Sequence, residues 1–311
     1  MLKIGIVGIG NISQKAYLPY TRQLPHIEWH VFTRDSETRQ KTYRLFGQVV
    51  AYNSLDALLQ VSLDGVFIHA ATQAHATIAS QFLKLGVPVY MDKPVTENYE
   101  TTKALYDLAE QHNTFLMAGF NRRFAPKVLK MADKTEKTRI YVEKNDSNRL
   151  GDFQFKLFDF FIHPLDTALF LADQELIGGH YHYHKVGGQL SQVSVVLETA
   201  RSTILASMNL QSGSRREVME VQTPEATYHL ENLETLSIYK GINQTIEHFS
   251  SWDTTLYKRG FETIILAFIE AIQNKENPVS PQSSLLSHWI CQQINTATQS
   301  SGRLDVKPPQ K

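Results

Sequence analysis

The chain has 311 residues, which is enough for two domains with a substantial hydrophobic core. Basic and acidic side chains balance at 31 each, so no general affinity for nucleic acid or an anionic membrane is expected. The single cysteine, Cys291, excludes a disulfide framework and a cysteine-based metal cluster. Apolar runs fall short of the roughly 18 residues of a membrane span, and a strand pattern beginning at Leu2 leaves no room for a signal peptide. The sequence therefore predicts a soluble cytoplasmic protein.

The opening stretch, MLKIGIVGIGNIS, carries the most informative pattern. An apolar run ending at Val7 predicts a strand buried on both faces, and a helical pattern begins near Ile12. Between them, Gly8 allows a tight turn, and Gly10 allows a pyrophosphate to approach the backbone beside the helix N-terminus. Ser13 stands where the dinucleotide-binding fingerprint has a third glycine or an alanine, which weakens the match without refuting it. The residues expected to hold the phosphates are Gly8, Gly10, Asn11 and Ile12.

Strands and helices are predicted to alternate through the first part of the chain. The further strands expected there are 27–33, 49–52, 65–68, 88–91 and 114–118. The helices expected between them are 35–46, 54–59, 74–85 and 99–112. This alternation predicts βαβ units and a parallel sheet, so residues 1–121 are expected to form a doubly wound, Rossmann-type α/β domain.

The pattern changes in residues 122–311, which are expected to form a second, α+β domain. Period-two alternation from residue 179 to residue 247, with turns near Gly187, Gly213 and Asn232, predicts a mostly antiparallel sheet with helices on one face. The other elements expected are a strand at 138–144 and helices at 126–133, 164–171, 257–273 and 285–298. The tail from Ser300 has low hydrophobicity and two prolines, so it is expected to be frayed.

Two short segments are placed to carry chemistry beside a bound nucleotide. Asp92-Lys93-Pro94 ends the fifth strand, at the carboxyl edge where ligands bind in such sheets, although a lysine-proline pair alone is more often a solvated turn. Asn121 follows the sixth strand, where the chain crosses into the second domain.

A second cluster runs from Asp159 to Asp166. Pro164 favours the first position of a helix, which would put His163 near the N-cap and keep its ring neutral and ready to accept a proton. If Asp159 bonds the other ring nitrogen, it fixes the tautomer. Asp166 would lie in the first turn, where a carboxylate stabilises the helix in any case.

Three histidines alternate along one strand, at His180, His182 and His184. With no carboxylate or fourth ligand evident nearby, an exposed or interface strand face is the favoured interpretation, and no metal site is predicted. Cys291 lies in a helical pattern and is expected to be a packed, unreactive thiol.

These motifs, in this order, resemble those of the Gfo/Idh/MocA family (relatives of glucose-fructose oxidoreductase and inositol dehydrogenase), and within it the MviM-like oxidoreductases. The family's glycine fingerprint and its Thr-Pro segment ending in histidine are matched by Gly8, Gly10, Ser13, Ala70, Ala71 and His75. Its Glu-Lys-Pro, Asn-Arg-Arg-Phe and Asp-x-x-x-His-x-x-Asp motifs are matched by Asp92 to Pro94, Asn121 to Phe124, and Asp159, His163 and Asp166.

The resemblance implies a hydride transfer between a nicotinamide cofactor and a sugar, cyclitol or related polyol. His163 would take the hydroxyl proton, Lys93 would hold the developing alkoxide, and Asp159 would orient and charge-balance His163. Further cofactor contacts are implied for Ala70, Ala71, His75, Asp92, Lys93 and Asn121. The family's open-faced sheet often forms oligomer contacts, so a homodimer or homotetramer is expected.

Cofactor choice and the class of protein each leave an alternative open. Thr33 stands where NAD sites usually carry an acidic ribose ligand, and Arg34 next to it suits a 2′-phosphate, whereas Asp35 more plausibly caps the next helix. NADP is therefore favoured, with NAD as the alternative. A non-catalytic dinucleotide sensor is the second function considered, but a sensor has no need of Lys93, Asp159 and His163 together.

Overall fold

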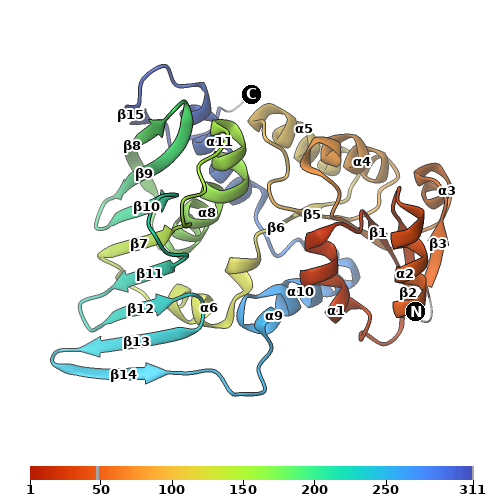
Figure 1. Ribbon diagram of the computed structural model, residues 1–311, viewed down its shortest axis with the longest axis horizontal. Helices are drawn as coiled ribbons and strands as arrows, with labels where there is room; N and C mark the ends of the chain where they lie inside the picture. The colour runs from red at the N-terminus through yellow and green to blue at the C-terminus, as the bar shows by residue number, and fades with distance from the viewer. Residues whose placement is uncertain (47–48, 310–311) are drawn as a thin grey trace. The chain divides into compact units, whose positions relative to one another are not determined.

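The computed structural model describes residues 1–46 and 49–309 (Figure 1). Its contacts divide the chain into two compact units, each assembled from two segments. Unit 1 comprises Met1–Gly119 and Phe261–Pro281, and unit 2 comprises Phe120–Gly260 and the chain from Gln282 onward.

The sequence predicts one domain boundary, after residue 121. In the structure, unit 1 also includes a helix from late in the chain. Helix α10 (Phe261–Asn274) is strongly amphipathic, and its Phe268 is fully buried. The Phe268 ring packs 4.8 Å from the ring of Phe67 and 5.6 Å from that of Tyr90, as measured between centroids. Aromatic burial of this kind is among the largest single contributions to a core, which explains why the helix belongs to unit 1.

Within the described residues, unit 1 holds a six-stranded, all-parallel sheet in the order β3-β2-β1-β4-β5-β6. The strands are β1 (Leu2–Val7), β2 (Ile27–Phe32), β3 (Val49–Tyr52), β4 (Gly65–Ile68), β5 (Val89–Asp92) and β6 (Leu116–Gly119). Strand β1 pairs with both β2 and β4, so the strand order reverses between β1 and β4. Ligands of doubly wound sheets bind at the carboxyl ends of the strands at such a reversal. The predicted Rossmann architecture is confirmed.

The helices of unit 1 follow the predicted alternation. They are α2 (Ser36–Phe46), α3 (Leu55–Leu59), α4 (Thr72–Lys84) and α5 (Tyr99–Gln111), and after β1 a π-helical turn η1 (Ser13–Tyr17) continues into α1 (Leu18–Thr21). The side chain of Ser54 accepts a hydrogen bond from the backbone N–H of Ala57, which is the predicted cap of α3.

Unit 2 contains, in the part of the chain described, a nine-stranded sheet in the order β14-β13-β12-β11-β7-β10-β9-β8-β15. Only the β7–β10 pairing in it is parallel, so the mostly antiparallel prediction is confirmed. The strands are β7 (Arg139–Lys144), β8 (Leu176–Val186), β9 (Gln189–Thr199), β10 (Thr203–Asn209), β11 (Glu217–Gln222), β12 (Thr227–Glu231), β13 (Thr235–Lys240), β14 (Asn243–Glu247) and β15 (Ser301–Leu304).

Helix α8 (Ile162–Leu171) packs on β7 and β10 of this sheet. The other helical elements of unit 2 are η2 (Asn121–Phe124), α6 (Pro126–Ala132), α7 (Phe153–Phe155), η3 (Lys156–Phe161), α9 (Thr255–Lys258) and α11 (Pro281–Thr296).

The helix start predicted at Pro164 is wrong. Helical backbone runs without a break from α7 through the π-helical η3 into α8, so His163 and Asp166 lie inside a helix and not in its first turn. Proline in a helix interior lacks a donor and crowds the carbonyl four residues earlier. The wider turn of η3 ends at Phe161, three residues before Pro164, and changes the hydrogen-bond pattern where that crowding would fall.

Two further sequence predictions need correction. The helix expected at 257–273 is split, because Gly260 adopts φ +78° at a place where a Cβ would strike the carbonyl oxygen of Asn121. The tail expected to fray instead supplies β15, which pairs antiparallel with β8. Trp289 on α11 also donates its indole N–H to the Asp305 carbonyl, which ties down the segment after β15.

None of the helices in the described part of the chain has the length and apolar character needed to cross a lipid bilayer.

Candidate cofactor and catalytic sites

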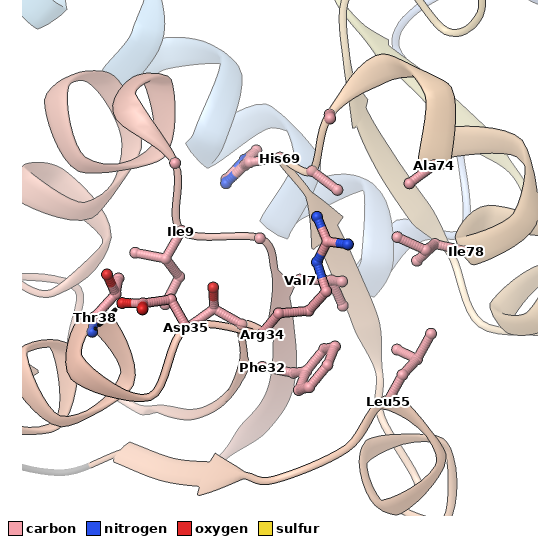
Figure 2. A pocket seen from close by; sticks show the side chains of 15 residues that line it. Val7, Ile9, Phe32, Arg34, Asp35, Thr38, Leu55, His69, Ala74 and Ile78 are labelled. Atoms are coloured by element: carbon pink, nitrogen blue, oxygen red, sulfur yellow. Dashed lines mark hydrogen bonds between the residues drawn. The ribbon is translucent and has the colours of Figure 1, made fainter.

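A cavity of about 550 Å³ opens in unit 1 where the strand order reverses (Figure 2). It is bounded by the ends of β1, β2 and β4 and the segments that follow them. Its lining residues are Val7, Gly8, Ile9, Gly10, Phe32, Thr33, Arg34, Asp35, Thr38, Leu55, His69, Ala70, Ala71, Ala74 and Ile78. A volume of this size lies in the range of small-molecule and cofactor sites.

The two glycines of the opening motif give this cavity its backbone wall. Gly8 has φ +89°, and a Cβ there would lie 2.6 Å from the backbone nitrogen of Ala70, so no other residue fits. A Cβ on Gly10 would meet nothing within 4 Å, which leaves its backbone open toward the cavity. A dinucleotide pyrophosphate requires this arrangement, with a tight turn at the first glycine and no side chain between the phosphates and the backbone of the second.

Ser13, in place of the third glycine, is fully buried and has a partner that the sequence did not indicate. Its hydroxyl lies 3.2 Å from Nδ1 of His69, and the His69 ring stacks on the ring of Tyr17 at 3.9 Å between centroids. Burial lowers the pKa of His69 to about 3, so its ring is neutral, and within the described residues its Nε2 atom has no hydrogen-bond partner. The serine is therefore part of a buried polar contact, which a glycine could not make.

The end of β5 is held by a buried pair of tyrosines. Tyr17 donates a 2.8 Å hydrogen bond to the Asp92 carboxylate, and its hydroxyl lies 2.8 Å from that of Tyr90. Burial raises the pKa of Asp92, while the neighbouring Lys93 charge and the Tyr17 hydrogen bond partly offset that rise. Lys93 follows directly, joined to Pro94 by a cis peptide bond.

His75 braces this turn from inside and does not line the cavity. It is 2% exposed, and its Nδ1 lies 3.1 Å from the carbonyl oxygens of both Pro94 and Val95. Its Nε2 lies 3.0 Å from the carbonyl oxygen of Ala70. The ring thus joins the segment after β4 to the segment after β5.

The wall after β2 carries the residues that bear on cofactor choice. Arg34 is exposed, and Figure 2 shows its guanidinium extending into the cavity. Asp35 accepts a 2.7 Å hydrogen bond from the backbone N–H of Thr38, so it caps α2 as predicted. Arg39 donates to the carbonyl of Thr33 and holds the turn.

The cavity gathers part of the predicted cofactor set. Six of those residues line it, namely Gly8, Gly10, Thr33, Arg34, Ala70 and Ala71. Five others lie outside the lining but in the same unit, namely Asn11, Ile12, His75, Asp92 and Lys93. Asn121 belongs to unit 2, where its side-chain amide donates to the Arg259 carbonyl. The apolar lining residues Ile9, Leu55, Ala74 and Ile78 were not predicted, because such residues cannot be told from core residues before the fold is known.

In unit 2, the ring of His163 forms a hydrogen bond with an arginine side chain. Its Nδ1 lies 2.7 Å from the NH1 nitrogen of Arg122. Arg122 is 4% exposed and forms a two-pronged ion pair with Glu217 on β11. That guanidinium lowers the pKa of the buried Glu217 carboxyl to about 2. Asp159 lies on η3, four residues before His163.

Asp166 plays a structural role. It is 1% exposed, and its carboxylate accepts hydrogen bonds from Arg123 and from the hydroxyl of Ser287 on α11. Buried carboxylates are stable only when paired and hydrogen-bonded in this way.

The histidine face of β8 is exposed as predicted, and the rings of His182 and His184 pack edge to face at 4.4 Å. Within residues 1–46 and 49–309, no group of three or more histidine, cysteine or acidic side chains is arranged to hold a metal ion. Cys291 is fully buried, and burial raises the pKa of its thiol.

Residues 2–120 match the family model described as "Oxidoreductase family, NAD-binding Rossmann fold", and residues 126–241 match that of the YceM-like C-terminal domain. A Salmonella typhimurium protein named YceM is 33% identical over 282 residues, which covers 89% of this chain and 91% of that protein. The chain belongs to the Gfo/Idh/MocA family.

Solved and curated Gfo/Idh/MocA relatives agree with this placement. A crystal structure of a Gfo/Idh/MocA family oxidoreductase from Vibrio cholerae matches with a TM-score of 0.89 at 30% identity, covering 94% of this chain and 97% of that one. Inositol 2-dehydrogenase from Rhizobium meliloti is 25% identical over 251 residues, covering 71% of this chain and 74% of that protein. As a Gfo/Idh/MocA member, the chain is an oxidoreductase with an NAD(P)-binding Rossmann domain.

Proposed function

We propose that this protein is an NAD(P)-dependent dehydrogenase or reductase that acts on a sugar, cyclitol or related polyol. The observation that carries the proposal is the cavity beside Gly8 and Gly10, where the positive φ of Gly8 and the unobstructed backbone of Gly10 suit a dinucleotide pyrophosphate. A nicotinamide dinucleotide bound there supplies the hydride acceptor or donor.

The protein's own contribution to cofactor binding begins with the backbone of Gly8 and Gly10 at the phosphates. Ala70 and Ala71 form the facing wall, and Arg34 is proposed to bind a 2′-phosphate, which favours NADP. Asn11, Ile12, Asp92, Lys93 and Asn121 complete the proposed cofactor set, and His75 is proposed to support it by joining the segments after β4 and β5.

Lys93 and His163 are proposed to act on the substrate oxygen, with Asp159 in support of His163. As an ammonium group, Lys93 would stabilise the negative charge that develops on this oxygen when a carbonyl is reduced, and in the oxidation direction its neutral amine would receive the hydroxyl proton. The polyol class is supported by the similarity to inositol 2-dehydrogenase, an enzyme named for its own polyol substrate.

The test is cofactor reduction measured with a panel of sugars and cyclitols, using NAD⁺ and NADP⁺ in parallel. Turnover of at least one polyol is expected, and Lys93→Ala should abolish most of it. A protein that binds either dinucleotide in calorimetry yet reduces neither with any member of the panel would instead fit a non-catalytic sensor.

A further inference from the structure

The contact between His163 and Arg122 restricts the protonation of the histidine ring. Their separation of 2.7 Å, between Nδ1 and NH1, is that of a short hydrogen bond. Guanidinium nitrogens only donate, so the NH1 group of Arg122 is the donor and Nδ1 of His163 the acceptor. A neutral ring that accepts at Nδ1 carries its hydrogen on Nε2. A doubly protonated ring would turn an N–H toward the guanidinium and lose this bond.

Arg122 is held in place by its other nitrogens. Nε and NH2 both donate to the carboxylate of Glu217, with NH2 2.9 Å from Oε2. Bidentate pairing fixes the plane of the guanidinium, and the Glu217 charge balances that of the arginine. The NH1 group is thereby aimed at the ring, and both partners of the ion pair are buried.

We propose that Arg122, held by Glu217, is a positioning residue that fixes the Nε2–H tautomer of His163, so that this ring meets the substrate oxygen as a hydrogen-bond donor and not as a base. The second half of this statement rests on the proposed function, whereas the tautomer is a property of the protein alone. A donor N–H stabilises negative charge on the substrate oxygen, as neutral imidazoles do elsewhere.

The proton then needs another route, and Lys93 is the other group assigned to the same oxygen. In oxidation, the hydroxyl proton passes to the amine of Lys93, which becomes an ammonium group as the hydride leaves the carbon. In reduction, the ammonium returns that proton to the new hydroxyl, so the charges balance in both directions.

The neighbouring arginine provides a matched control. Arg123 forms the same kind of buried, two-pronged ion pair, with Asp166, but its NH1 group donates to the hydroxyl of Ser283 and not to a histidine. Substitution of either arginine with its carboxylate partner removes a buried ion pair, but only the Arg122 pair contacts His163.

The tautomer is measured directly by long-range proton–nitrogen correlation of the imidazoles in ¹⁵N-labelled protein at neutral pH, without added ligand. The His163→Gln variant identifies the His163 signals by their loss. We expect a protonated, pyrrole-type Nε2 and an unprotonated, pyridine-type Nδ1. A pyrrole-type Nδ1, or a ring protonated at both nitrogens, would overturn the proposal.

Variants then test the cause. Arg122→Met combined with Glu217→Leu removes the donor and its counter-charge together, so no buried charge is left unpaired. The ring should relax to a mixture of tautomers, whereas Arg123→Met with Asp166→Leu should leave the Nε2–H form dominant. Arg122→Lys keeps the ion pair but lacks the guanidinium fork, so it should also give a mixture.

An unchanged Nε2–H signal in both Arg122 variants would show that the arginine does not set the tautomer. The wild-type spectrum decides the tautomer whether or not any variant folds. If no polyol of the panel is turned over but the spectrum shows Nε2–H, the proposed function alone is rejected. If a polyol is turned over but the spectrum shows a pyrrole-type Nδ1, this inference alone is rejected.

Discussion

Tyr17 donates its phenolic hydrogen to the carboxylate of Asp92 over 2.8 Å, joining the turn after the first strand to the residue before Lys93. Aspartate is one methylene shorter than the glutamate in the motif that this segment resembles. The buried Tyr17 hydroxyl gives the shorter side chain a fixed partner, and a second tyrosine, Tyr90, supports that hydroxyl. Two departures from the family motifs, Ser13 and Asp92, therefore lie on one buried cluster around Tyr17 and His69.

The first prediction follows from this bond. Tyr17→Phe removes a hydrogen-bond donor from a buried carboxylate, so unfolding should require about 1–3 kcal/mol less free energy than for the wild type. Tyr90→Phe is the control, because it leaves the Tyr17–Asp92 bond in place and should cost less. Urea titrations of the two variants at neutral pH measure the difference. Equal losses of unfolding free energy in the two variants would mean that the hydrogen bond from Tyr17 to Asp92 does not stabilise the fold.

Acid should destabilise unit 1 through His69. The folded protein lowers the pKa of His69 to about 3, whereas an unfolded chain binds the proton near 6.5. The stabilisation is therefore complete above pH 6.5 and is lost as the pH falls toward 3, at about 2 kcal/mol between pH 7 and pH 5. In His69→Phe, the fall in stability between these two pH values should be smaller by that amount. The control His112→Gln removes an exposed imidazole, and a similar flattening in it would contradict the assignment.

Cofactor preference is tested at Arg34. If its guanidinium binds a 2′-phosphate, Arg34→Ala should weaken NADP binding by about 1.5–3 kcal/mol, roughly 10- to 150-fold, and leave NAD binding nearly unchanged. Lys41→Ala removes a cation from the same region without touching the cavity lining and serves as the control. Isothermal titration calorimetry with both dinucleotides measures the selectivity. Equal losses for both cofactors would reject the assignment of Arg34.

The expected oligomer is tested on the nine-stranded sheet, at the face opposite its buried side chains. On β9, Val193, Val195 and Leu197 are buried, whereas Val196 lies half-buried on the other face, directly opposite Leu205 of β10. We expect a homodimer or homotetramer that covers this mixed apolar and polar face.

Val196→Glu should then weaken the assembly, and Val196→Thr, which keeps the side-chain shape, should not. Sedimentation at micromolar concentration measures the mass, and a single wild-type species at the 35.4 kDa of one chain would contradict the expectation.

What the sequence could predict was local. The turn at Gly8 and Gly10 and the cap at Ser54 depend on residues within a few positions, so pattern and propensity were sufficient. The helix start predicted at Pro164 was wrong because a π-helical turn precedes α8 without a break in the helix. Such turns are rare, and local sequence preference does not predict them.

The partners of the candidate catalytic histidine could not be predicted. Glu217 lies 95 residues from Arg122 in the sequence, in an alternating strand where a glutamate looks like a solvent-facing residue. No pattern in the sequence singles out His69, and only the fold brings its ring onto Tyr17. Buried polar contacts of this range depend on topology, which no local pattern encodes.

The last prediction concerns turnover of whichever polyol the panel identifies. His163→Ala should lower kcat by roughly a hundred- to ten-thousand-fold and leave dinucleotide affinity nearly unchanged, because the ring is assigned to the substrate oxygen and not to the phosphates. Lys93→Ala should lower kcat comparably and also weaken dinucleotide binding, since this residue belongs to the proposed cofactor set. Asp159→Asn should cost less and shift the pH–rate profile. His180→Ala, on the exposed face of β8, is the control. Near-wild-type turnover by His163→Ala would show that another group acts on the substrate oxygen.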